Sequence, residues 1–243
     1  MLYFVTHCFF YKQAKQCIKT GQVFSWNWAL ENPTPPLFGR QAIQHKYIPH
    51  TDDDLAFDDC IDNFNPQAST QWDGLRHISQ VTVGKFYNGV TPQEVTDGVS
   101  GRLGIQHMAE RGIAGRAVLL DFARWAEEHR PDYNPLERQE ITVEELQEVA
   151  DAQGVTFKQG DILLVRVGWM AAYEKEGHRL AEMMDLTHPE CAGVKACPET
   201  FKWVWDNHFA AVCSDNFPFE AFPPKWEESC RKSPFLTLRI RSF

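Results

Sequence analysis

The sequence predicts an α/β fold, because short apolar runs typical of buried strands alternate with segments that favour helix. Three runs carry this prediction, at residues 115–121, 160–168 and 209–214. The first two begin at a glycine and the third ends before Asp215, and such boundaries are typical of strands. We therefore expect an α/β or mixed architecture, with helices between the strands.

The N-terminal third is expected to hold mostly turns and loops. The stretch 31–36 contains three prolines, and each disfavours helix in the residue before it. Residues 50–66 are rich in aspartate, which predicts a solvated loop; a metal-binding acidic cluster is the alternative. Asn88-Gly89 marks a turn, and residues 91–111 favour a helix towards their end.

Four further helices are expected among the strands. Residues 121–130 favour a short helix that stops at Pro131. Thr142 and Glu145 form a capping-box pattern, and the helix that they start ends near Gly154. The other two helices are expected at residues 169–183 and 198–206.

The charge balance argues against nucleic acid or a membrane as a partner. The formal net charge is −9 and the sequence pI is about 5.5, so an acidic surface repels phosphate groups and anionic lipid. No apolar run approaches the roughly 18 residues that a membrane-spanning helix needs. The first ten residues lack the basic start of a secretory signal. We expect a cytoplasmic protein of one domain, residues 1–243, that acts on a small molecule.

The spacing of the cysteines and the lack of common nucleotide-binding and hydrolase motifs argue against several classes of protein. The seven cysteines form no CxxC pair, which argues against a zinc ribbon or a thioredoxin-like centre. No GxSxG, GxGxxG or P-loop motif occurs. Cys213, Ser214 and Asp215 lie at the end of a predicted buried strand, where α/β active sites often lie. A structural thiol is expected there; a nucleophile is the alternative, and it needs a nearby base.

The segment with the most chemistry runs from residue 67 to residue 77. Asp73 and His77 lie four residues apart, so on a helix they share one face, and on a turn they can converge. A carboxylate beside an imidazole makes either a metal site or an acid–base pair. The alternative is an aspartate that caps a helix, with a histidine whose hydrogen bonds are satisfied nearby.

This segment resembles the signature HxGTHxDxxxH of the cyclase family, which includes bacterial kynurenine formamidases. In that signature two histidines and the aspartate bind a divalent metal, usually zinc or manganese, and the last histidine is the acid–base catalyst. Thr70 matches the threonine, Asp73 the metal aspartate and His77 the catalytic histidine. Gln67 and Gln71 stand where the two metal histidines would be.

Other stretches, in the same order along the chain, resemble the fungal branch of the family. The resemblance spans roughly residues 25–225 and leaves an atypical tail at residues 226–243. The matching stretches are Asn32-Pro33, 38–40, 71–77, 86–89, 111–121 and 160–169.

The resemblance implies a swivelling β/β/α fold, a mixed sheet with flanking helices, and usually a homo-oligomer. It implies metal-dependent hydrolysis of an amide, ester or lactone bond, with N-formylkynurenine and tryptophan catabolism as models. Trp72, Phe86 and Tyr87 would form an aromatic wall for the substrate, with His107 approaching it. Packing in the core is an equal alternative for the three aromatic residues.

Two departures from the family pattern favour a rival interpretation. Gln67 and Gln71 offer neutral amide oxygens, which manganese tolerates better than zinc. No histidine follows Asp215, although family members carry a later histidine and glutamate that complete the metal site; only Glu220, Glu227 and Glu228 remain. The rival is a non-catalytic relative that has lost its metal. A ring-forming or ring-opening enzyme of fungal secondary metabolism is a further alternative.

Overall fold

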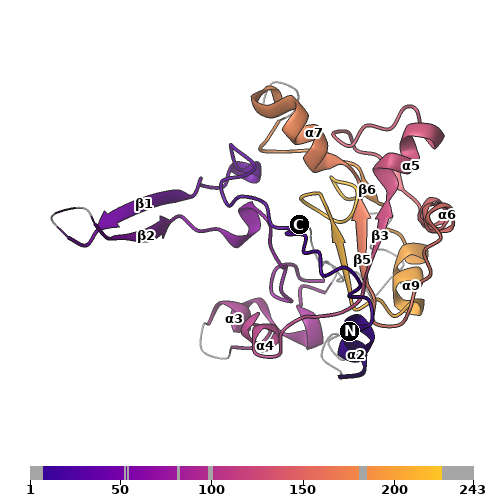
Figure 1. Cartoon of the computed structure of the whole chain (residues 1–243), viewed down its shortest axis with the longest axis horizontal. Coiled ribbons are helices and arrows are strands. Elements are labelled where there is room, and N and C mark those ends of the chain that lie inside the picture. The colour runs from indigo at the N-terminus through magenta and orange to yellow at the C-terminus, as the bar shows by residue number, and fades with distance from the viewer. Residues whose placement is uncertain are drawn as a thin grey trace.

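A three-stranded parallel sheet lies at the centre of the protein (Figure 1). The computed structural model describes residues 8–225, apart from residues 52, 54, 81, 82, 98–100 and 181–184. The strands lie in the order β3, β5, β7, with Leu119 beside Leu164 and Leu164 beside Cys213. All three predicted strands are confirmed, each slightly shorter than its apolar run: β3 (Ala117–Asp121), β5 (Ile162–Arg166) and β7 (Ala211–Ser214).

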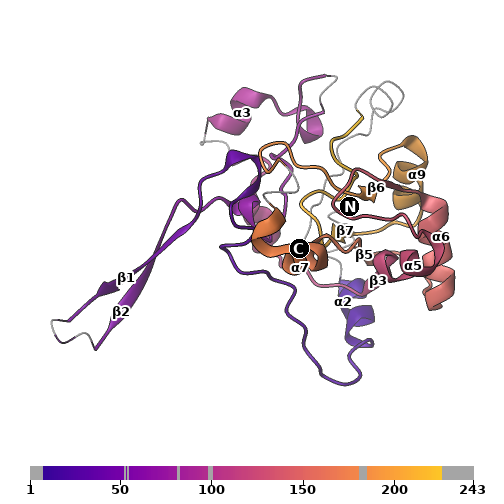
Figure 2. The same cartoon turned by 90° about the horizontal axis from the view of Figure 1, so that it is seen from above.

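Helices flank this sheet, and α5, α6 and α9 lie together on one side of it in both views (Figures 1 and 2). The strands β4 (Glu140–Ile141) and β6 (Gly193–Val194) form a second, short parallel pair. The α-helices are α2 (Cys8–Lys15), α3 (Pro92–Thr96), α4 (Gln106–Ala109), α5 (Phe122–His129), α6 (Val143–Gln153), α7 (Trp169–Glu176) and α9 (Pro198–Asp206). The 3-10 turns are η1 (Leu37–Gly39), η2 (Pro66–Ala68), η3 (Tyr87–Gly89) and η4 (Gly177–Arg179).

The predicted start and end signals of α6 are confirmed. The Thr142 side chain accepts a hydrogen bond from Glu145 N, and the Glu145 side chain accepts one from Thr142 N. These reciprocal bonds satisfy two backbone N–H groups that have no partner within the first turn of a helix. Gly154 closes the helix at φ 64°, a left-handed conformation that glycine adopts without strain.

The aspartate-rich region at residues 50–66 is not wholly a loop, and that prediction was wrong. β1 (Gln44–Pro49) pairs antiparallel with β2 (Phe57–Asp62), and the hairpin points away from the rest of the described chain in both views (Figures 1 and 2). Ion pairs join the strands, between His45 and Asp59 at 2.6 Å and between Lys46 and Asp62. The aspartates therefore pair across strands, which sequence spacing alone does not reveal.

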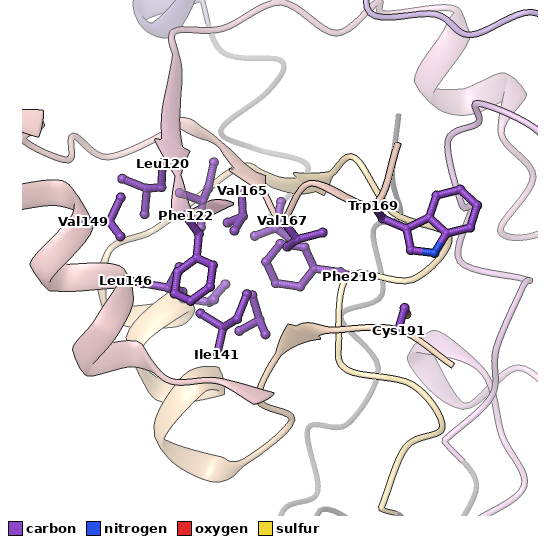
Figure 3. Close-up of a cluster of buried hydrophobic side chains, with 14 of the residues drawn as sticks. Leu120, Phe122, Ile141, Leu146, Val149, Val165, Val167, Trp169, Cys191 and Phe219 are labelled. Atoms are coloured by element: carbon purple, nitrogen blue, oxygen red, sulfur yellow. The ribbon is translucent and has the colours of Figure 1, made fainter. Parts of the chain in front are cut away.

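The core lies between the sheet and α5 and α6 (Figure 3). Strand β3 buries every second residue, Val118 and Leu120, as expected for a strand with one face on the core. Phe122 at the start of α5 is fully buried, and its ring meets Tyr133 edge-on at 5.0 Å. The core also takes in Ile141, Leu146, Val149, Leu163, Val165, Val167 and Trp169.

Some expectations fall on residues outside the described part. The N-terminal residues 1–7 and the atypical tail at residues 226–243 lie there, and with the tail Glu227 and Glu228. Among the described helices, none is long and apolar enough to cross a lipid bilayer.

Candidate active site

The segment that carries Asp73 and His77 is fixed to the N-terminal part of the chain by hydrogen bonds. Trp28 N donates to Thr70 Oγ1 at 2.9 Å, and Ser69 Oγ donates to Ala29 O at 2.9 Å. Further along, His77 N donates to Gly74 O at 3.0 Å and closes a turn. The turn brings the side chain of His77 back towards residue 73.

The structure brings Asp73 and His77 together. His77 Nε2 lies 4.0 Å from Asp73 Oδ1, which is within ion-pair range and longer than a hydrogen bond. The Asp73 side chain is fully buried, whereas the His77 side chain is 24% exposed. The part-exposed imidazole can exchange a proton with water or a substrate. This arrangement suits acid–base chemistry.

A pocket that is partly open to solvent lies next to this segment. Gln67 and Gln71 both line it, so the two positions that match metal histidines in the family signature do face a common space. The opposite wall follows the carboxyl ends of β5 and β7, where α/β proteins place their ligands. The full lining is Trp28, Pro33, Leu37, Arg40, Gln67, Ala68, Ser69, Thr70, Gln71, Trp169, Met170, Asp215, Asn216 and Phe217.

Three of the lining residues are aromatic, and sequence reasoning did not place them in the site. Trp169 meets Trp28 edge-on at 6.4 Å and Phe217 edge-on at 5.5 Å. Such contacts give the pocket rigid, flat walls. The three rings come from segments up to 189 residues apart (217 minus 28), and only the position of Trp169 directly after a predicted strand hinted at its role.

Asp215 holds the far wall of the pocket in place. Its carboxylate accepts hydrogen bonds from Val167 N at 2.6 Å and from Gly168 N at 3.0 Å, so it joins the end of β7 to the turn before α7. Gly168 has φ 90°, which a side chain would strain. Burial raises the pKa of Asp215, and the two backbone N–H groups oppose that shift. Because backbone amides engage its oxygens, Asp215 serves to position the end of β7 and the turn before α7.

The other residues predicted for the substrate lie away from this pocket lining. Trp72 donates from Nε1 to Met108 Sδ at 3.2 Å and packs against the core. Tyr87 is 52% exposed in η3, next to the half-buried Phe86. His107 lies exposed in α4, with Nε2 3.2 Å from Gly101 O. Trp72 and α4 are therefore neighbours, on a side of the segment that does not line the pocket.

The described donors do not make up a catalytic zinc centre. Such a centre uses three strong protein ligands, usually histidine, cysteine or carboxylate. Here Asp73 and His77 are two, Gln67 and Gln71 add only neutral amides, and no group of three or more His, Cys, Asp or Glu side chains fit for a metal occurs within the described ranges. The metal that the family signature implies thus lacks its ligand set among these residues.

Cys213 lies on the far side of Asp215, in a second pocket of about 700 Å³ on the sheet. Burial raises the pKa of the Cys213 thiol to about 12. At pH 8 only on the order of one thiol in ten thousand would be the reactive thiolate. Cys213 therefore behaves as a structural thiol.

We expect iodoacetamide at pH 8 to leave Cys213 unmodified in the native protein and to modify the exposed Cys17 readily. Peptide mass spectrometry before and after unfolding in urea gives the measurement. Rapid native modification of Cys213 would show an activated thiol and reopen the nucleophile alternative.

The parallel sheet, its flanking helices and the aromatic pocket at the carboxyl edge of the sheet define a mixed α/β protein. A family model described as putative cyclase matches residues 19–221 of the sequence. Because this match covers most of the chain, the protein belongs to the cyclase family. No curated protein matches the sequence.

Solved structures show the same fold. A crystal structure described as a novel cyclase is 24% identical, with a TM-score of 0.74 over 91% of this chain and 74% of that one. Isatin hydrolase A from Ralstonia solanacearum is 14% identical, with a TM-score of 0.57 over 86% and 74%. Isatin hydrolase A from Labrenzia aggregata, bound to benzyl benzoate, is 15% identical, with a TM-score of 0.55 over 87% and 75%. The predicted cyclase-like architecture is confirmed.

Proposed function

We propose that this protein hydrolyses an amide or ester bond of a small aromatic molecule, with His77 and Asp73 as its acid–base pair. The observation that carries the proposal is the fully buried Asp73 carboxylate 4.0 Å from the part-exposed His77 imidazole. Gln71, two residues before Asp73, lines the aromatic pocket, so the pair belongs to the segment that forms one pocket wall. Structural likeness to two isatin hydrolases fits this class of reaction.

The reaction needs one proton to move twice. His77 takes a proton from water, and the resulting hydroxide adds to the substrate carbonyl carbon. The protonated His77 then gives its proton to the leaving nitrogen as the carbon–nitrogen bond breaks. The Asp73 carboxylate, 4.0 Å away, stabilises the charged imidazole between these steps. With a formamide as substrate the products are formate and the free amine; with a lactam or lactone the same addition opens the ring.

The direct test is hydrolysis of N-formylkynurenine by the purified chain at pH 7.5. Because the described donors fall short of a zinc set, the assay is run both with EDTA and with added manganese or zinc. We expect formate and kynurenine in equal amounts under at least one of these conditions. No hydrolysis of this substrate, or of an aryl lactam or lactone, under any of them would contradict the proposal.

A second candidate is a binding protein without catalysis. It is favoured by the two glutamines at the positions of the metal histidines and by the lack of a third strong ligand among the described residues. The same assay separates the two candidates, since this one predicts ligand binding in the pocket without turnover.

A further inference from the structure

Two side chains of the pocket each carry a buried polar atom that no hydrogen bond satisfies within the described part of the chain. Gln71 Oε1 is a hydrogen-bond acceptor, and the indole Nε1 of Trp169 is a donor. Trp169 as a whole is only 2% exposed. Buried polar atoms in native proteins are nearly always paired, so each exception calls for a ligand or a bound water.

Two other polar side chains of the pocket, Asp215 and Asn216, are engaged. Asp215 accepts from the backbone N–H groups of Val167 and Gly168. Asn216 donates from Nδ2 to Ala192 O at 2.5 Å and accepts from Phe217 N at 2.9 Å. Among the buried side-chain atoms of the described pocket lining, one acceptor on Gln71 and one donor on Trp169 are left for a ligand.

The walls around these two atoms set the shape of the ligand. Trp28, Trp169 and Phe217 are packed edge to face, and flat rings of this kind suit a planar, mostly apolar molecule. The Gln71 oxygen repels another oxygen and attracts an N–H group. A carboxylate offers no N–H group to it, and a protonated amine offers no acceptor to Trp169.

We propose that the pocket binds a planar neutral amide, whose N–H donates to Gln71 Oε1 and whose carbonyl oxygen accepts from Trp169 Nε1. Gln71 then holds the substrate directly at a position where the family signature has a metal histidine. The inference rests on the proposed function for its assumption that this pocket holds the substrate. A formamide or a lactam, each with one N–H and one carbonyl, fits this pair of atoms.

Benzamide is the probe, and its affinity is measured by isothermal titration calorimetry on the full chain. We expect Gln71→Met and Trp169→Phe each to weaken benzamide binding by about 5- to 20-fold, the loss typical of one buried hydrogen bond. N,N-Dimethylbenzamide accepts a hydrogen bond but donates none. Its affinity should fall in Trp169→Phe and stay the same in Gln71→Met.

Comparing the two probes distinguishes the loss of one hydrogen bond from the loss of the folded structure. Gln71→Met keeps the length of the side chain and removes an unsatisfied buried oxygen, so its melting temperature should be equal to that of the wild type or higher. If Trp169→Phe does not fold, the two probes on Gln71→Met decide alone. Failure of benzamide to bind the wild-type chain, or equal benzamide affinity in Gln71→Met, would overturn the inference.

Binding is measured without turnover, so the two proposals can fail separately. Amide binding with the predicted contrast, in a protein that hydrolyses nothing, contradicts the hydrolase and supports this inference. Hydrolysis of N-formylkynurenine with an unchanged KM in Gln71→Met supports the hydrolase and contradicts this inference.

Discussion

Replacing His77 by alanine is expected to lower kcat/KM for N-formylkynurenine by about 100- to 10,000-fold, the usual contribution of a positioned acid–base group. The loss should fall on kcat, because a proton-transfer group acts in the transition state and contributes little to binding of the ground state. Steady-state kinetics of the wild type and the variant give the measurement. Circular dichroism checks that the variant, altered at a part-exposed side chain, keeps its fold.

His129→Ala is the matched control for this prediction. His129 lies exposed on α5, where its Nδ1 is 2.8 Å from Trp125 O, and it does not line the pocket. Its loss should leave kcat/KM unchanged. Full activity in His77→Ala would remove this residue from the mechanism.

The largest effect on stability is expected at Phe122. This side chain is fully buried within the core cluster (Figure 3). The centroid of its ring lies 5.5 Å from that of Trp125 and 5.0 Å from that of Tyr133. Phe122→Ala removes the ring and leaves a cavity between the sheet and α5, so the free energy of unfolding should fall by about 3–5 kcal/mol. Urea unfolding followed by circular dichroism measures the loss.

Two controls locate that effect in the core. Phe122→Leu keeps most of the buried volume and should cost clearly less than the alanine variant. Trp205→Ala removes an even larger ring, but Trp205 is 63% exposed on α9, so the change should stay within about 0.5 kcal/mol. A loss below about 1 kcal/mol in Phe122→Ala would mean that this cluster is not the main core.

The sheet and most helices could be predicted because their signals are local. The buried strand at residues 162–166 is one apolar run between glycines, and helix α6 has a cap at Thr142 and a stop at Gly154. The hairpin of β1 and β2 could not be predicted, since its strands are mostly exposed and carry no apolar alternation. Its pairing depends on contacts such as Lys46 with Asp62, 16 residues apart.

Only one part of the candidate site, the segment from residue 67 to residue 77, could be predicted from the sequence. Gln67, Gln71, Asp73 and His77 lie within eleven residues, and the order of their residue types pointed to a common centre. The opposite wall of the pocket could be identified only from the fold, because parallel strands bring the ends of β5 and β7 to one edge of the sheet. No local pattern indicates that Trp169 faces the same space as Gln71.

The most direct test of the Asp73–His77 pair is a double-mutant cycle on kcat/KM with Asp73→Asn, His77→Ala and the double variant. Groups that act as one unit lose their effect together, so the double variant should be about as slow as the slower single variant. Losses that multiply in the double variant, or wild-type activity in Asp73→Asn, would contradict the pair as the catalytic unit of this protein.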